Sequence, residues 1–421
     1  MLNDGSYNYS LVGAPVTGKN KIEMDEMGAS LWMDWQSGYL NDMFGVQLGY
    51  QSAAPNLYNN GYVEAQNSMV PGITVKSDYA RYYEATPDSA VVGKVSNANL
   101  QMRLGDDENY TKLSVGRFTP TIYNLLHRPD YIYYATHEVY EGASLTGELN
   151  WSWGMIQPWF NYFTGYSNCH TTGTVRFKDD LKEGVGSGYF DKIYNVGYHT
   201  ETDYFTSSAS YSVAPDYQKN GLVEVYTGIP LSYLAGNPDG DRSKILKFLI
   251  KYGMEEGTGK LNSDHKTDVV EYGIGIDTGD FDLLAGVTKI GKESFRGFET
   301  QDGYKAGGGT AVWGDLAVFN KFDRANQTTY FLFGGYNLDN VGFQKWRIQG
   351  VAAMATDTDR SKMSVVEQAL VAKEDYTEIN LELAYNYRGE GLGYRFMVGT
   401  DTNMKVSGFG LFIEYNTDIL K

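Results

Sequence analysis

Hydrophobic and polar residues alternate one by one along most of the chain. In residues 378–388 (EINLELAYNYR), the odd-numbered side chains are apolar or aromatic, and the even-numbered ones are mostly charged or amide-bearing. Successive side chains of a β-strand point to opposite faces, so this period of two predicts strands with one apolar and one polar face. The pattern recurs at 44–51, 244–253 and 405–416, whereas helical periodicity is almost absent.

Alternating segments cover the chain from end to end and give about 18 predicted strands. No proline- or serine-rich linker separates them, so we expect one domain over residues 1–421. The predicted strands are 3–10, 28–36, 42–52, 95–104, 110–118, 139–150, 153–164, 189–200, 203–213, 219–228, 244–253, 267–276, 280–290, 328–338, 342–355, 374–388, 392–401 and 405–416.

The connections between these strands alternate in length. Brief turns such as GDDEN and DTGD alternate along the chain with long segments such as 119–138 and 291–327. Short turns on one rim and long loops on the other are typical of an outer-membrane β-barrel, with the turns periplasmic and the loops extracellular.

Two architectures can use strands of this kind. A soluble β-sandwich buries the apolar face, whereas a transmembrane barrel turns it toward lipid. Three features favour the barrel: the pattern spans the chain without a break, Trp and Tyr gather near strand ends, and charged residues occupy mid-strand positions. We therefore expect an all-β, antiparallel transmembrane barrel of about 18 strands, with long loops folding into the lumen. A soluble, multi-sheet carbohydrate-binding protein is the alternative.

Composition narrows the choice further. The 421 residues carry a net charge of -17, which disfavours nucleic-acid binding because phosphates require Lys and Arg. Mean hydropathy is -0.40, and no segment approaches the ~20 apolar residues of a membrane-spanning helix. The single cysteine, Cys169, excludes an intrachain disulfide and a cysteine-based zinc site. The opening MLNDGSYNYS lacks the features of a signal peptide, so an exported protein would be represented here by a mature or engineered form.

Three blocks of sequence resemble one known family. Residues 110–149 contain Gly116, Pro120, a Leu-Leu pair and an aromatic-x-Gly end, and residues 31–50 and 319–343 carry further similar turns and strands. These blocks resemble the OprD family of substrate-specific Gram-negative porins, and within it the chitoporins of enteric bacteria. Two features depart from the family pattern: THEVYEG lacks the expected proline, and the chain does not end in an aromatic residue.

The resemblance implies an eighteen-strand barrel whose loops form a narrow eyelet for small nutrients. Selective pores replace part of a solute's hydration with polar groups, and aromatic faces suit the apolar faces of sugar rings. Alternatively, several tyrosines pack the loop against the wall, and Asp323 and Arg324 form a local ion pair. The constriction candidates from loops 119–138 and 291–327 are Tyr123, His127, Arg128, Asp130, Tyr131, Tyr133, Tyr134, His137, Trp313, Asp315, Asp323 and Arg324.

Strand parity assigns a second group of polar residues to the barrel wall facing the lumen. A basic strip opposite acidic loops would create a transverse field across the pore. The simpler alternative is that these charges pair with neighbours and keep the lumen hydrated. The wall candidates are Lys247, Lys251, Lys345, Arg347, Asn380, Glu382 and Arg388.

No sequence motif indicates catalysis, a cofactor or a metal. NPDGD at 237–241 does not fit a 12-residue calcium loop, and His199 is the only histidine at a plausible strand position. We therefore expect a channel rather than an enzyme.

The sequence leads to an expected function of passive, substrate-selective diffusion across the outer membrane of a Gram-negative bacterium. By resemblance, the solute is a small oligosaccharide such as a chitooligosaccharide, and the alternative is a carboxylate or an amino acid. The expected partners are membrane lipid, lipopolysaccharide and the solute, without nucleic acid. We expect a monomer rather than a trimer.

Overall fold

The computed structural model describes most of the chain. The described residues are 7–13, 20–23, 25–59, 62–65, 74–76, 92–119, 139–167, 175–176, 191–237, 239–258, 264–295, 298–299, 305–306, 322, 324–362, 374–386, 389–402 and 406–416.

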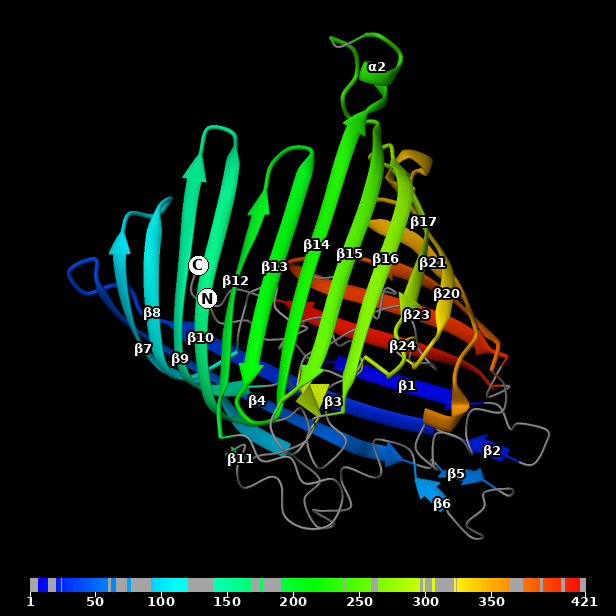
Figure 1. The fold of residues 1–421 in the computed structure, drawn as a ribbon, viewed down its shortest axis with the longest axis horizontal. Helices are drawn as coiled ribbons and strands as arrows, with labels where there is room; N and C mark the ends of the chain where they lie inside the picture. Colours follow the sequence, from blue (N-terminus) through cyan, green and yellow to red (C-terminus); the bar gives the residue numbers. More distant parts are fainter. Residues whose placement is uncertain are drawn as a thin grey trace.

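The described residues form one large antiparallel sheet with small additions (Figure 1). Its strands are β1 (Tyr7–Gly13), β3 (Asp25–Gln36), β4 (Phe44–Asn59), β7 (Val92–Gly105), β8 (Tyr110–Phe118), β9 (Val139–Trp151), β10 (Gly154–Ser167), β11 (Val175–Arg176), β12 (Ile193–Glu201), β13 (Phe205–Ala214), β14 (Gln218–Pro230), β15 (Ile245–Gly257), β16 (Lys266–Asp277), β17 (Phe281–Ile290), β20 (Thr328–Asn337), β21 (Trp346–Thr356), β22 (Tyr376–Tyr385), β23 (Gly391–Asp401) and β24 (Val406–Asn416). The smaller elements are β2 (Asn20–Glu23), β5 (Tyr62–Ala65), β6 (Thr74–Lys76), β18 (Phe298–Glu299), β19 (Lys305–Ala306), α2 (Leu231–Leu234), η1 (Leu338–Val341) and η2 (Arg360–Lys362).

The large sheet closes on itself. Each strand pairs with its neighbours along the chain, and β1 pairs with both β24 and β3, as in the registers Asn8↔Ile413 and Tyr7↔Ser30. The described sheet has 19 strands, of which the two-residue β11 pairs only with β10, so the closed ring contains the other 18. The predicted antiparallel barrel is therefore confirmed, and each predicted strand overlaps one strand of the ring. A ring of one sheet excludes a sandwich of two packed sheets.

Short turns have the local chemistry that reverses a strand. Between β16 and β17, the Asp277 carboxylate accepts a hydrogen bond of 2.8 Å from the amide of Gly279, which has φ +86°. The Thr278 amide bonds the Phe281 carbonyl at 2.8 Å and closes the turn. Glycine tolerates this left-handed conformation without a Cβ penalty. The longest connection on this rim contains α2, which projects beyond the strand ends at the top of Figure 1.

The polarity of the barrel is inverted relative to a soluble protein. Ile250 and Ile274 lie near the middle of β15 and β16, point outward and are each 53% exposed. On the inward face of the same sheet, Glu271 and Glu382 are 0% exposed. A soluble protein rarely exposes a continuous apolar band, because removing apolar surface from water is the main favourable term in folding. An outward apolar band around a polar interior is typical of a barrel surrounded by lipid.

Aromatic side chains frame this band at both rims. Toward the short turns, the outward rings of Trp346, Tyr385 and Tyr394 follow one another across β21, β22 and β23 with centroids 5.1 and 5.9 Å apart. Toward the long connections, Tyr162 and Tyr194 lie 5.4 Å apart on β10 and β12. Tyr and Trp are enriched at membrane–water interfaces because they have an apolar ring and a polar tip. No helix among the described residues is long and apolar enough to cross a membrane.

A charge introduced into the apolar band tests its surroundings. Ile250→Lys should lower the free energy of unfolding from lipid vesicles by about 2–4 kcal/mol, because a cation near the bilayer centre destabilises a barrel when it lies on the exterior. The control is Val341→Lys, since Val341 is 56% exposed but lies in η1, beyond the strand ends. Denaturant titration of both variants gives the comparison. Equal, small effects would mean that the band faces water.

Candidate functional site

The inner wall of the ring is the candidate site, because strand parity directs its polar side chains into the lumen. Burial alternates along β15, where Lys251 and Leu249 are buried and Ile250 is exposed. Lys247 shares their parity. The same rule places Arg347 on β21 and Asn380 and Glu382 on β22 at inward positions. Five wall candidates thus occupy lumen-facing positions, and their contact with a solute stays a prediction.

Two wall candidates lie elsewhere. The predicted strand 342–355 begins only at Trp346, because η1 and Gly342, with φ +90°, form a turn first. Lys345 is exposed in this turn with φ +65°, and its amide donates to the Asp339 carboxylate at 2.6 Å. Its assignment to the wall is therefore wrong. Arg388 lies outside the described residues, and β22 ends at Tyr385.

A chain of polar contacts joins four strands on the inner wall toward the short-turn rim. Arg347 pairs with Asp282 of β17 and donates from Nε to the Gln349 side-chain oxygen at 2.9 Å. The Gln349 amide donates to Glu382 at 2.8 Å, and Glu382 pairs with Arg395 of β23. We call these five residues the wall charge chain. It extends by a 2.8 Å bond from Arg347 to Asn337 of β20, which lies between β17 and β21.

The two lysines on β15 are paired as well. Lys247 bonds to Asp277 of β16, and Lys251 bonds to Glu224 of β14, its direct neighbour in register. Neighbour pairing, the simpler of the two sequence-based alternatives, therefore describes Lys247, Lys251, Arg347 and Glu382. Opposite charges held this close cancel most of each other's field at distances beyond a few ångströms.

Carboxylates outnumber cations on the described inner wall. The inward-facing Asp and Glu residues are Asp34, Glu148, Glu201, Glu224, Glu255, Glu271, Asp277, Asp282, Glu378, Glu382 and Asp401. The inward-facing Lys and Arg residues are Lys94, Arg103, Lys112, Lys247, Lys251, Arg347 and Arg395.

Neutral polar residues dominate a second sector of the inner wall. Asn195 of β12 accepts bonds from the Trp159 indole at 2.8 Å and from Asn161 at 3.0 Å. Its amide group is within 2.9 Å of the hydroxyls of Ser210 and Ser212 on β13. Buried amides need such partners, since an unsatisfied polar group is costly. The interior thus has a largely amide and hydroxyl sector and a charged sector.

A cation at the short-turn rim lies between two aromatic rings. The Arg103 guanidinium of β7 is 5.4 Å from the ring of Tyr39 and 4.8 Å from that of Tyr110, within cation–π range. Asp107 pairs with it at 2.8 Å. Burial raises the pKa of the Tyr39 phenol, and the nearby guanidinium partly opposes that effect. The Tyr39 hydroxyl also donates to the side-chain oxygen of Gln101 at 3.0 Å. Gln101 and Arg103 are two residues apart on β7, so strand parity could have assigned Arg103 to the inner face from sequence.

Part of the predicted inward loop is held against the wall. Arg324 is buried, lies 5.3 Å from the Tyr376 ring and donates to its hydroxyl at 2.8 Å. That hydroxyl donates in turn to Gln327 at 3.1 Å. At the other end of the loop, the Phe295 ring covers Gly253 of β15, where a Cβ would come within 2.9 Å of it. The loop ends therefore fold inward onto the wall.

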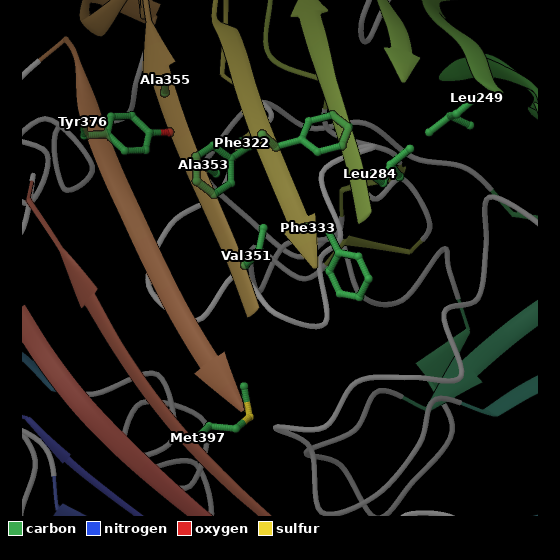
Figure 2. Close-up of a cluster of buried hydrophobic side chains, with 10 residues drawn as sticks. Leu249, Leu284, Phe322, Phe333, Val351, Ala353, Ala355, Tyr376 and Met397 are labelled. Atoms are coloured by element: carbon green, nitrogen blue, oxygen red, sulfur yellow. The ribbon is translucent and has the colours of Figure 1, made fainter. Parts of the chain in front are cut away.

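Phe322 of this loop packs against an apolar patch on the inner wall. The sequence analysis did not predict this patch. Figure 2 shows inward side chains of β15, β17, β20, β21, β22 and β23 gathered with Phe322 of the loop. Phe331 and Phe333 share the inward parity of Thr329, so the inner face is apolar here. The run TYFLF, with apolar residues on both parities, was the available signal. The patch comprises Leu249, Leu284, Phe322, Phe331, Phe333, Val351, Ala353, Ala355, Tyr376 and Met397.

The remaining constriction candidates fall outside the part of the chain that the structure describes. They are Tyr123, His127, Arg128, Asp130, Tyr131, Tyr133, Tyr134, His137, Trp313, Asp315 and Asp323. Among the described residues, no group of three or more His, Cys, Asp or Glu side chains is arranged to hold a metal ion.

Comparison with solved structures finds the same fold in proteins of Pseudomonas aeruginosa. The chain superposes on OccK9 (OpdG) with a TM-score of 0.70 at 13% identity, covering 99% of this chain and 97% of that one. OccK8 (OprE) gives 0.69 at 12% identity, with 99% and 98% covered, and OpdK with vanillate gives 0.68 at 12%, with 99% and 97% covered. Protein-family models and curated proteins give no match. Likeness at this identity establishes the fold.

The buried end of the wall charge chain yields a stability prediction. Arg395 is 3% exposed, so Glu382→Gln, which removes its charged partner, should lower the free energy of unfolding by about 3–5 kcal/mol. Urea unfolding in detergent micelles provides the measurement. The double variant Glu382→Leu/Arg395→Met should recover most of the loss, because it removes both charges. A double variant as unstable as the single one would contradict the pairing.

The more exposed end of the wall charge chain provides a matched comparison for this stability effect. Asp282 and Arg347 form the same kind of pair, but their side chains are 24% and 29% exposed. Asp282→Asn should therefore cost only about 0–1 kcal/mol, since water can solvate the remaining guanidinium.

Proposed function

We propose that this protein is an outer-membrane channel that gives small hydrophilic solutes a passive path across the bilayer. The observation that carries the proposal is the closed ring with an apolar exterior and a charged interior. The similarity in fold to OpdK, described as an outer membrane protein of Pseudomonas aeruginosa, gives independent support. If the barrel is oriented like other outer-membrane barrels, its long connections are extracellular and its short turns are periplasmic.

The wall charges favour a neutral or cationic solute. Carboxylates exceed cations among the described inward residues, and the lysines of β15 already have carboxylate partners. A dianion entering this lumen would meet more repulsion than attraction. Together with the resemblance to chitoporins, this supports a small oligosaccharide such as a chitooligosaccharide as the solute, within an OprD-like channel.

A carboxylate or amino-acid channel is the second candidate. OpdK, a protein of the same fold, has been crystallised with the aromatic carboxylate vanillate. Lys247 and Arg347, whose side chains remain 44% and 29% exposed, could exchange their protein partners for a solute carboxylate. Such an exchange would have to replace a bond within the wall, which makes it the less favoured reading.

Single-channel recording tests the proposal and separates the two solutes. We expect a stable conductance in planar bilayers, cation preference in a KCl gradient, and discrete current blocks by chitooligosaccharide but not by vanillate. A protein that stays monodisperse without detergent and forms no channel would refute the proposal in favour of a soluble β-protein. Blocks by vanillate alone would support the carboxylate channel.

Charge neutralisation on the wall should change ion selectivity. Asp277→Asn/Asp282→Asn removes two inward carboxylates and frees Lys247 and Arg347, so the reversal potential in a KCl gradient should move toward anion preference. Asp239→Asn, in the exposed connection beyond β14, should leave the potential nearly unchanged. Equal shifts in both variants would mean that the wall does not set selectivity.

The loop 119–138 supplies the predicted eyelet residues, which lie outside the described residues. Tyr131→Ala or Arg128→Ala should shorten the blocks caused by chitooligosaccharide, because each removes a group expected to contact the sugar. Tyr233→Ala, on α2 beyond the opposite rim, is the control. Unchanged conductance and block duration in the loop variants would reject these two residues as part of the constriction.

A further inference from the structure

Three lysines lie on the outward face of the barrel at the long-connection rim. Lys219 is the second residue of β14, Lys266 the first of β16 and Lys289 the last but one of β17. Each is adjacent in sequence to a buried, inward-facing residue, so its own side chain points out. We call these three residues the outer lysine patch.

Strand register brings two of these lysines close together. Lys219 and Lys266 are both paired in register with Glu256 of β15, which therefore lies between them. Two strand spacings separate their Cα atoms, which amounts to roughly 10 Å. Asp268 follows two residues after Lys266 on the same face. The two carboxylates offset two of the three positive charges, so the patch attracts anions by contact rather than at long range.

No carboxylate within the described ranges forms an ion pair with Lys219, Lys266 or Lys289. By contrast, Arg117 lies on the outward face at the same rim, and its guanidinium is bound to Glu141 at 2.8 Å. The three ammonium groups can therefore accept an external anion without breaking an ion pair to any described carboxylate.

An apolar surface continues from the patch toward the middle of the barrel. On β14, β15 and β16, the outward Val223, Ile250, Tyr252 and Tyr272 are exposed. A lysine at the edge of such a surface extends its apolar stem over it and holds the ammonium group at the polar boundary. The resulting surface is complementary to an amphiphile that carries phosphate above hydrocarbon chains.

We propose that the outer lysine patch binds the phosphate groups of lipopolysaccharide, with the acyl chains lying on the apolar surface beside it. This proposal rests on the proposed function, because that function places the long-connection rim in the outer leaflet. The phosphates of a phospholipid have similar chemistry. We choose lipopolysaccharide because it is the lipid of the outer leaflet, where the proposed function places this rim. Basic residues near a membrane surface each strengthen the attraction to anionic lipid.

Binding of purified lipid A to the full chain in neutral detergent tests the proposal. Lys219→Gln/Lys266→Gln should weaken binding by roughly 30-fold, from the usual contribution of two lysines at a membrane surface. The control Lys244→Gln/Lys345→Gln makes the same change of charge in exposed residues at the opposite rim and should keep the wild-type affinity. Lipid A stripped of its phosphates should bind wild type as weakly as lipid A binds the patch variant.

Three outcomes would overturn the proposal. These are wild-type affinity in the patch variant, equal binding of dephosphorylated lipid A, or equal competition by phosphatidylglycerol, which would mean a general phospholipid site. Conductance in phosphatidylcholine bilayers separates this inference from the channel function. The patch variant should conduct like wild type there, whereas a wild-type protein without conductance would refute the channel and leave the lipid-binding result to be judged by itself.

Discussion

Closure of the sheet is the constraint on which the rest of this molecule depends. A sheet with a free edge leaves a row of backbone donors and acceptors without partners, and no lipid environment can supply them. The pairing of β1 with both β24 and β3 removes that edge within the described strands. With the backbone satisfied, the two faces are free to differ. Ile250 and Ile274 can remain outside only because the surrounding medium is apolar as well.

Inside the barrel, charged side chains lose hydration when they are buried, and this loss disfavours folding. Glu382 and Arg395 are both almost completely buried, and each compensates the other's loss of hydration. The same arrangement is repeated less tightly at Asp282 and Arg347, where water still reaches the side chains. Along this one row of residues, the wall therefore changes from a buried ion pair to a partly exposed one.

The face of each strand residue could be predicted from sequence, because a period of two fixes it once the polar side is known. That rule assigned Lys247, Lys251, Arg347 and Glu382 to the inside. It failed at Lys345, where a turn with left-handed residues replaces the first part of the expected strand. It also missed the inward Phe331 and Phe333, since apolar residues on both parities do not identify a face. Partners such as Asp282 for Arg347 depend on register and turn length, which one sequence does not reveal.

The side-chain amide of Gln349 has a consequence for how the wall is assembled. Sliding β21 past β22 by two residues would leave each side chain on the face that it now occupies, so hydrophobicity alone cannot reject that error. In the observed register Gln349 stands opposite Glu382, and a slip would place it opposite Asn380 or Ala384 instead. Its oxygen accepts from Arg347 of the same strand, and its nitrogen donates to Glu382 of β22, a contact that depends on this alignment. The contact between Gln349 and Glu382 thus favours the observed alignment of β21 and β22 over one shifted by two residues.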